Sequence, residues 1–158
     1  MGSLVGPFYL NLGRDFHPQP LPPDVPAGEI KACYANAGRL ALERDDLQYC
    51  EGFAMKKGLF PVHHAWCTTA LGHVVDPTWD HTPGMEYRGV VLNKSYLRNT
   101  VERNGVWGVL AEMLPEAQTL GQIERYLHPD WMPEQDQRAL FLEALALALP
   151  SASSRGLR

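Results

Sequence analysis

Cys33, His64 and Asp76 are the residues whose types and order point to a chemistry in this chain. Cys33 lies in the segment KACYANA, His64 begins the segment HAW and Asp76 lies in the segment VVDPTW. A thiol, an imidazole and a carboxylate are the nucleophile, the base and the orienting group of a nucleophilic triad. Cysteine attacks a carbonyl as the thiolate, so its pKa must fall from about 8.5 toward neutrality. A helix N-terminus and an adjacent imidazole both favour the thiolate.

His64 and Asp76 are expected on the two strands of one β-hairpin. Residues 62–69 and 73–76 read as short strands joined by a tight turn. A hairpin that closes near Ala70 places His64 directly opposite Asp76. Opposed side chains of an antiparallel pair lie roughly 5 Å apart. The spacing therefore predicts an imidazole held by a carboxylate.

Strand periodicity distinguishes the two adjacent histidines of this hairpin. Successive side chains of a strand point to opposite faces. His64 shares its face with Trp66. His63 goes with Ala65 and Cys67. Of the pair, His64 is therefore the candidate base, and the alternative is a structural histidine packed beside a tryptophan.

The surrounding elements predict an α+β fold with an antiparallel sheet packed on its leading, nucleophile-bearing helix and with additional C-terminal helices. The leading helix is expected to begin between residues 28 and 32 and to run to about residue 44. One face of that helix carries, at helical spacing, Cys33, Asn36, Ala37 and Leu40. Other strands are expected at 8–10, 47–55 and 87–92, and other helices at 95–103, 106–114, 118–127 and 134–149.

Three local details accompany these elements. Ser95 is a candidate cap of the helix that follows it. Gly52, which follows Glu51 within a strand, is interpreted as the mark of a β-bulge, and Glu51 is given no catalytic role. The apolar stripe of the last helix is expected to consist of Leu140, Leu142, Leu145 and Leu149.

Length and composition fit one domain of ordinary size. The chain has 158 residues, of which 45% are hydrophobic, so it can bury a real core. The domain is expected over residues 1–150, with a proline-rich arm at 17–27 and a disordered tail at 151–158.

Charge and cysteine content limit the classes of partner. The formal net charge is −4 and the basic residues are scattered, which argues against nucleic acid as a partner. No apolar run reaches the ~18 residues that a membrane span needs, and no signal peptide is evident, so we expect no membrane partner and a cytoplasmic location. Three cysteines are an odd number, which leaves at least one thiol free.

These motifs resemble the transglutaminase-like branch of the papain-like cysteine protease superfamily. The similarity covers residues 30–79: a cysteine at a helix start, a histidine in an HAW strand and an aspartate in a VDPT strand. The resemblance implies a nucleophile at Cys33, a general base at His64 and an orienting carboxylate at Asp76, with no cofactor. It also implies an amide or thioester carbonyl in a protein or peptide substrate, and hence peptide cleavage, glutamine deamidation or acyl transfer.

The sequence departs from that superfamily before the nucleophile. Papain-like enzymes often have a glutamine there that helps to bind the oxyanion, whereas residues 26–30 contain none. The oxyanion donors must then be the backbone N–H of Cys33 and a second group, for which Asn36 is the candidate. Trp66 and Trp79 are candidate walls of a substrate pocket, with core packing as the alternative.

Two other classes of function compete with the enzyme hypothesis. The first is a non-catalytic binding module, such as a phage or bacterial effector that blocks a protein partner through the proline-rich arm. The second is a zinc site built from the cysteines and histidines. The zinc hypothesis has less support, because His63 and His64 are the only close pair of ligands with the spacing of a structural zinc site, and adjacent residues of a strand point apart. The sequence does not indicate an oligomeric state.

Overall fold

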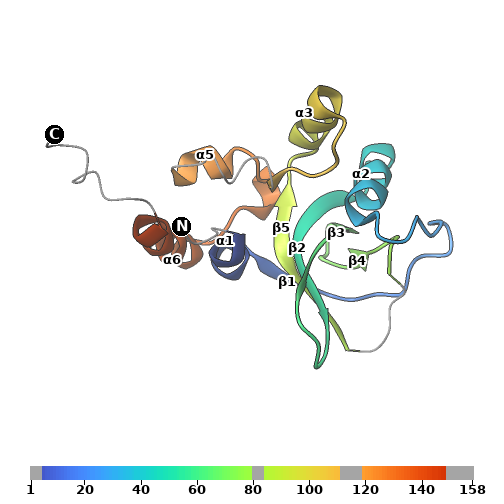
Figure 1. Ribbon diagram of the computed structural model, residues 1–158, viewed down its shortest axis with the longest axis horizontal. Coiled ribbons are helices and arrows are strands. Elements are labelled where there is room, and N and C mark those ends of the chain that lie inside the picture. The colour runs from blue at the N-terminus through green and yellow to red at the C-terminus, as the bar shows by residue number, and fades with distance from the viewer. Residues whose placement is uncertain (1–4, 80–83, 111–118, 149–158) are drawn as a thin grey trace, which may run out of the picture.

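An antiparallel sheet forms the centre of the molecule and helices lie against it, as the computed structural model in Figure 1 shows. The structure describes residues 5–79, 84–110 and 119–148. The predicted α+β class is confirmed, and the predicted C-terminal helices follow the last strand along the chain. The expected tail at 151–158 and residues 111–114 of the expected helix at 106–114 lie outside the described residues. The part of that helix expected over 106–109 is wrong, because these residues are not helical and Gly108 has a φ of 125°.

The sheet has the strand order β1-β5-β2-β3-β4. At its centre lies β2 (Gln48–Lys56), which pairs antiparallel with β3 (Val62–Thr68) and with β5 (Met85–Leu92). The outer strands are β1 (Arg14–Phe16) and β4 (Val74–Val75). Because β4 is only two residues long, it pairs only with Cys67 and Thr68 of β3. The earlier residues of β3, 62–66, are not paired with β4.

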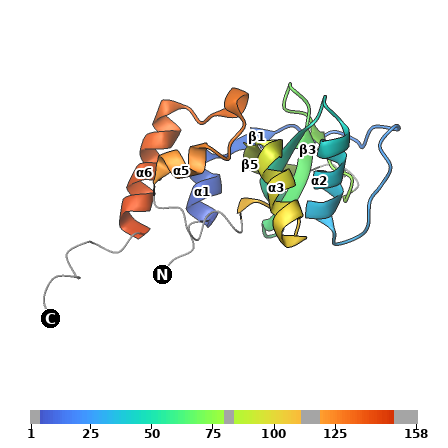
Figure 2. The ribbon, with the colours of Figure 1, turned by 90° about the horizontal axis from the view of Figure 1, so that it is seen from above.

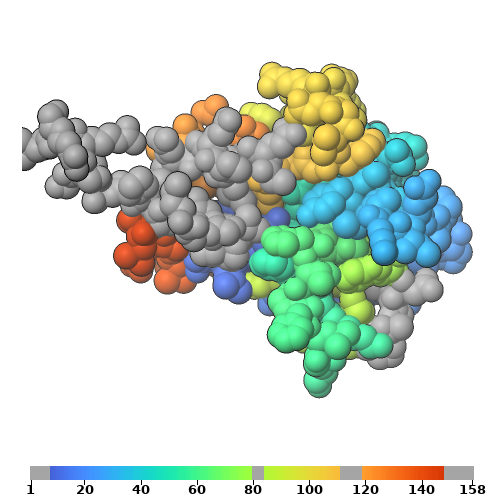
Figure 3. All heavy atoms as spheres, in the orientation of Figure 1, coloured from blue at the N-terminus to red at the C-terminus, as the bar shows by residue number. Residues whose placement is uncertain are grey.

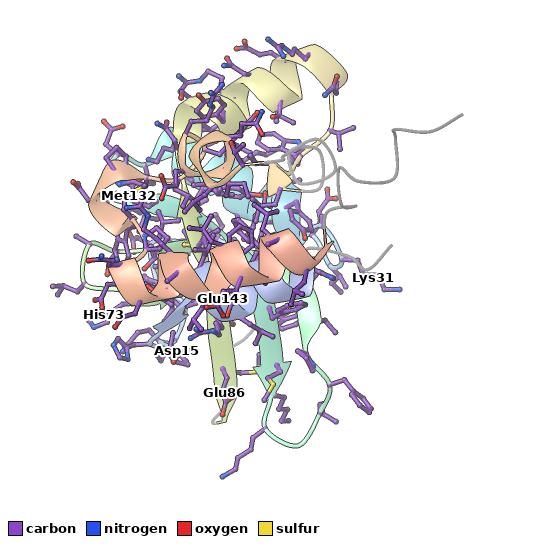
Figure 4. The ribbon with its side chains drawn as sticks, turned by 90° about the vertical axis from the view of Figure 1, so that its left-hand side faces the viewer. Asp15, Lys31, His73, Glu86, Met132 and Glu143 are labelled. Atoms are coloured by element: carbon purple, nitrogen blue, oxygen red, sulfur yellow. The ribbon has the colours of Figure 1, made fainter. Side chains whose placement is uncertain are left out.

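The helices are α1 (Val5–Leu12), α2 (Cys33–Glu43), α3 (Lys94–Asn104), α5 (Leu120–Glu124) and α6 (Gln135–Ala148), with a 3-10 turn η1 (Pro129–Trp131). α2 lies against β3, whereas α1 packs against α6 at the other end of the molecule (Figure 2). In Figure 4, α6 crosses in front of the sheet with Glu143 on its exposed side. None of the helices in the described ranges is long and apolar enough to cross a membrane.

Two apolar clusters lie on opposite faces of the sheet, as strand alternation requires. The larger cluster packs the sheet against the helices and includes Tyr49 of β2 and Cys67 of β3. The smaller cluster is aromatic and includes Trp66 of β3 and Tyr87 of β5. Trp66 and Cys67 therefore lie in different clusters, as expected for adjacent residues.

The segment 8–10 is helical, and the strand expected there is wrong. Phe8 and Leu12 are both buried at a spacing of four residues, which is a helical period. A short apolar run fits either kind of element, and here the contact of α1 with α6 selects the helix.

The last helix buries a different stripe from the expected one. Phe141 and Leu145 are buried at a spacing of four residues, while Leu140 and Leu142 are 55% and 48% exposed. Leu149 lies outside the described residues. A helix this rich in leucine offers several apolar stripes, so the sequence alone does not select the one that faces α1.

Helix ends differ from the prediction by a few residues because the capping residues differ. Asn93, not Ser95, is the N-cap of α3, and its side chain accepts a hydrogen bond from the Ser95 N–H. The helix expected at 118–127 is the shorter α5, which begins with a capping box formed by Thr119 and Gln122.

The expected bulge at Gly52 is wrong, because the ladders on both sides of β2 are continuous through that residue. Gly52 instead permits a close approach of neighbouring atoms. A Cβ there would lie 2.2 Å from the carbonyl oxygen of Arg88 and 2.8 Å from the Cη2 atom of Trp66. Gly89, its partner on β5, is equally close to Trp66. The indole of Trp66 therefore lies over two glycines of adjacent strands.

Gly52→Ala is expected to destabilise the fold by about 3 kcal/mol, because the added methyl group overpacks a site closed by backbone atoms. Gly121→Ala in α5 is the matched control, since a Cβ there meets no atom within 4 Å. The control should be neutral or slightly stabilising. Urea unfolding of both variants measures the difference, and equal stabilities would contradict the packing explanation.

Candidate active site

Cys33 is the first residue of α2, so its thiol lies at the helix N-terminus. The preceding N-cap residue, Ala32, makes no side-chain capping hydrogen bond, and Lys31 has a φ of 64°. A left-handed conformation is uncommon for a residue with a Cβ. The first N–H groups of α2 are therefore left without a side-chain cap, and their partial positive charge lies beside the thiol.

Asn36, one turn into α2, ties the helix to the two loops beside the site. Its Nδ2 atom donates to the carbonyl oxygen of Glu29 at 2.7 Å and to the Oγ1 atom of Thr78 at 3.0 Å. Its Oδ1 atom accepts from the Glu29 N–H at 3.2 Å. The polar atoms of Asn36 are thus engaged within the protein. This geometry favours a positioning role over the oxyanion-donor role expected from the sequence.

The imidazole of His64 and the carboxylate of Asp76 are joined by a short hydrogen bond, 2.7 Å from Nε2 to Oδ2. Both side chains are buried, with exposures of 2% and 0%. The hairpin register differs from the expected one, since Cys67 pairs with Val75. That register places Asp76 across from Trp66, so Asp76 reaches His64 diagonally from just beyond the end of β4.

Four hydrogen bonds converge on the carboxylate of Asp76. The Oδ2 atom accepts from His64 and, at 2.8 Å, from the hydroxyl group of Tyr87. The Oδ1 atom accepts from the backbone N–H groups of Thr78 at 2.9 Å and Trp79 at 3.3 Å. A carboxylate has about four lone-pair sites, so this buried charge is fully satisfied.

The thiol and the imidazole meet at the outer edge of β3, although α2 and the His64 ring belong to opposite faces of the sheet. α2 packs against β3 beside the part of the strand that β4 does not cover, and the two elements lie side by side in Figure 3. The side chain of Cys33 lies near enough there to the His64 ring and to the backbone of Ala65 for both groups to lower the pKa of its thiol. Since Nε2 of His64 is held by Asp76, Nδ1 is the ring nitrogen left for the sulfur.

These contacts favour a thiolate–imidazolium pair. Burial alone would raise the pKa of the Cys33 thiol, but the hydrogen bond and the positive charge of His64 outweigh it and lower that pKa below its ordinary value. Burial alone would lower the pKa of His64, but the hydrogen bonds to Asp76 and Cys33 raise it to about 9. Both shifts favour the proton on the His64 nitrogen over the Cys33 sulfur.

Two tryptophans pack around the imidazole in different ways. The indole of Trp79 stacks on the His64 ring, with centroids 4.0 Å apart and planes 15° apart, and it is half-buried. Trp66 is completely buried, with its centroid 6.3 Å from that of His64. Trp66 therefore supports the ring from inside the smaller cluster. The expected role as a pocket wall stays a prediction for Trp79, whereas Trp66 has no surface with which to contact a substrate.

The other two cysteines have quite different surroundings. Cys50 and Cys67 are both fully buried, and burial raises the pKa of each thiol. Cys67 donates to the carbonyl oxygen of Ala37 at 3.2 Å, which helps to hold α2 on the sheet. These two cysteines are structural, and neither is disulfide-bonded.

Glu51 and Tyr87 are the residues of importance that sequence reasoning missed. Glu51, on the helix-covered face, accepts from the Tyr49 hydroxyl at 2.8 Å and from the N–H groups of Val109 and Leu110 at 2.6 and 3.0 Å. Tyr87 lies on the same face as Trp66 because β5 and β3 both pair with β2, whereas the sequence offered only the alternation within β5 itself. Its bond to Asp76 depends on the pairing of β5 with β2, which local patterns do not reveal.

The donors of the zinc hypothesis are not gathered together in the described part of the chain. It contains no group of three or more His, Cys, Asp or Glu side chains that could hold a metal ion. His63 packs on Phe53 and Tyr9, on the opposite face from His64.

Comparisons with protein-family models, curated proteins and solved structures found no match for this chain.

Iodoacetamide near pH 7 is expected to label Cys33 at least about tenfold faster than Cys50 or Cys67, because only Cys33 combines partial exposure with a lowered pKa. His64→Ala should slow the labelling of Cys33, since the imidazolium that stabilises the thiolate is lost. Peptide mass spectrometry after timed quenching measures the three rates. Equal rates at all three thiols would contradict the ion pair.

Cys33→Ala is expected to change how the free energy of unfolding depends on pH. With the thiol removed, the hydrogen bond to Asp76 still favours the proton on His64 in the folded protein, so we expect stability to fall as the pH rises through the titration of this ring. In the wild type the thiol loses its proton at a lower pH when folded than when unfolded, and this opposite effect offsets the loss.

Urea unfolding between pH 6.5 and 9 should therefore give a steeper decline of stability in Cys33→Ala than in the wild type. The double variant Cys33→Ala/His64→Gln is the control and should lose the additional slope. Parallel curves for the wild type and Cys33→Ala would show that the two groups do not share a proton.

Proposed function

We propose that this protein is a cysteine-dependent hydrolase or acyltransferase that acts on an amide or thioester carbonyl of a protein or peptide substrate. The observation that carries the proposal is the hydrogen bond of 2.7 Å from His64 to the buried Asp76, on an imidazole whose proximity to Cys33 lowers the pKa of that thiol. The resemblance of the segments around these residues to transglutaminase-like enzymes of the papain-like superfamily supports it. In this proposal Cys33 is the nucleophile, His64 moves the proton and Asp76 orients the ring.

Acylation begins when the thiolate of Cys33 attacks the carbonyl carbon. The carbon–sulfur bond forms as the π electrons of the carbonyl group move to its oxygen, which gives a tetrahedral oxyanion. On collapse, the bond to the leaving nitrogen or sulfur breaks, and the imidazolium of His64 gives its proton to that leaving atom. The acyl group then remains on Cys33 as a thioester.

Deacylation returns the site to its starting state. The now neutral imidazole of His64 takes a proton from a water molecule or an amine, which attacks the thioester carbonyl. The carbon–sulfur bond breaks, the acyl group leaves as an acid or an amide, and the thiolate–imidazolium pair is restored. Water gives hydrolysis or deamidation, and an amine gives acyl transfer.

The start of α2 is suited to stabilise the oxyanion. The N–H of Cys33 belongs to the first turn of α2, which no side chain at Ala32 caps. Such N–H groups are unsatisfied donors with a partial positive charge, and they strengthen as negative charge develops on the substrate oxygen. We therefore assign this role to the helix N-terminus rather than to the Asn36 amide, whose bonds to Glu29 and Thr78 are already made.

Trp79 is suited to protect the catalytic base. Its indole covers one face of the His64 ring at 4.0 Å and so limits the access of water to the imidazole. A site with less water strengthens the hydrogen bond between His64 and Asp76, since the effective dielectric constant falls.

Cys33→Ala is expected to abolish turnover while the protein stays folded, because Cys33 is only partly buried. Asp76→Asn should lower kcat at least about a hundredfold, since an amide no longer favours the productive tautomer of His64. Asp45→Asn, on the exposed segment after α2, is the matched control and should retain wild-type activity.

A panel of peptide anilides, glutamine peptides and thioesters, followed by mass spectrometry of the intact protein, tests the reaction directly. A mass increase on Cys33 that equals the acyl group supports the proposal. Full activity of Cys33→Ala on any member of the panel would contradict it, and so would a failure of every electrophilic acyl donor to modify Cys33.

A further inference from the structure

A buried hydroxyl group lies directly behind the proposed catalytic residues. Tyr87, near the start of β5, is 2% exposed, and its hydroxyl donates to the Oδ2 atom of Asp76 at 2.8 Å. This is the same oxygen that binds Nε2 of His64 at 2.7 Å. The Tyr87 ring is held by Trp66, with an edge-to-face contact at 5.1 Å between centroids.

The two donors on Oδ2 compete for the same negative charge. A hydroxyl that donates to a carboxylate oxygen withdraws charge from it, and this weakens the oxygen as an acceptor for any second donor. The Oδ1 atom is held separately by the backbone N–H groups of Thr78 and Trp79. The carboxylate therefore stays in place when the hydroxyl is removed, and only the charge on Oδ2 changes.

We propose that Tyr87 is a positioning residue for the proposed triad: its hydroxyl holds Oδ2 of Asp76 and limits the negative charge that this oxygen presents to His64. The proposal rests on the proposed function. By this means Tyr87 keeps the imidazolium acidic enough to give its proton to the leaving group. Without the hydroxyl, Asp76 would hold the protonated ring too tightly for rapid proton transfer.

Few ionisable groups act on this site within the described residues. Asp76 and Cys33 are the ionisable partners that raise the pKa of His64. Burial and the neighbouring charge of Asp76 raise the pKa of the Tyr87 hydroxyl, so it stays protonated and serves as a donor throughout the working pH range. The Tyr87 ring also contacts the His64 ring, with centroids 6.2 Å apart, and Tyr87→Phe keeps this contact while it removes the hydrogen bond of the hydroxyl to Asp76.

The direction of the pKa change separates this role from a merely structural one. In Tyr87→Phe the more basic carboxylate should raise the pKa of His64 and lower that of the Cys33 thiol. If Tyr87 only kept the site folded, its loss would loosen Asp76 and move both pKa values in the opposite direction, as Asp76→Asn should.

The experiment compares Tyr87→Phe with Tyr49→Phe and Asp76→Asn. Tyr49 is a matched control, because its hydroxyl is equally buried but donates to Glu51 on the opposite face of the sheet. The first readout is the pH profile of iodoacetamide labelling at Cys33, together with the NMR titration of the His64 ring. The second is kcat and KM on an acyl substrate that modifies the wild type.

In Tyr87→Phe we expect the acid limb of the labelling profile to move to lower pH and the His64 titration to higher pH. Asp76→Asn should shift both in the reverse sense, and Tyr49→Phe should leave both unchanged. We also expect kcat of Tyr87→Phe to fall about tenfold at unchanged KM, in keeping with one hydrogen bond to a charged group.

An unchanged profile, or a shift in the same sense as that of Asp76→Asn, would overturn the role of Tyr87. Failure of the proposed function gives a different result, namely turnover that survives Cys33→Ala. The labelling and NMR measurements need no substrate, so they decide the role of Tyr87 in either case.

Discussion

The buried carboxylate of Asp76 is the constraint on which the site depends. A charge with 0% exposure is very costly unless its hydrogen bonds are made within the protein. Four donors meet this requirement, and they come from β3, from β5 and from the loop that follows β4. Each of these segments must take its observed place before the charge can be buried. The folding that forms the four hydrogen bonds to the Asp76 carboxylate therefore also fixes the position of the His64 ring.

The loop after β4 also fixes the helix that carries the proposed nucleophile, Cys33. The carbonyl oxygen of Pro77 accepts from the Gly28 N–H at 2.7 Å, and the Thr78 hydroxyl accepts from Asn36 at 3.0 Å. These bonds hold the segment before α2 and the first turn of α2 against the loop whose N–H groups bind Asp76. One short segment thus connects the acid side chain to the helix that begins at Cys33. The sulfur and the imidazole lie on different elements, yet their separation is controlled by a single loop.

The sequence predicted the pairing of His64 with Asp76, but not its geometry. The strands were evident from local alternation, whereas the register was placed two residues off, because the turn is closed by a bond from the Thr69 N–H to the His73 carbonyl oxygen. The predicted contact forms despite this error, because a shift of two residues leaves Asp76 on the same face of the sheet as His64. The hydroxyl of Tyr87 was not predictable, because its approach depends on the long-range pairing of β5.

Two buried carboxylates, Asp76 and Glu51, have different partners, and this explains why only Asp76 belongs to the proposed triad. Glu51 accepts from two backbone N–H groups and from the Tyr49 hydroxyl, and burial raises its pKa. None of these donors can take up or release a proton near neutral pH, so Glu51 holds the chain that leads into the next helix. Asp76 faces an imidazole that can change its charge and that contacts a thiol on its other side. The difference therefore lies in the partners of the two acids rather than in the acids themselves. It arises because strand alternation places His64 and Glu51 on opposite faces of the sheet.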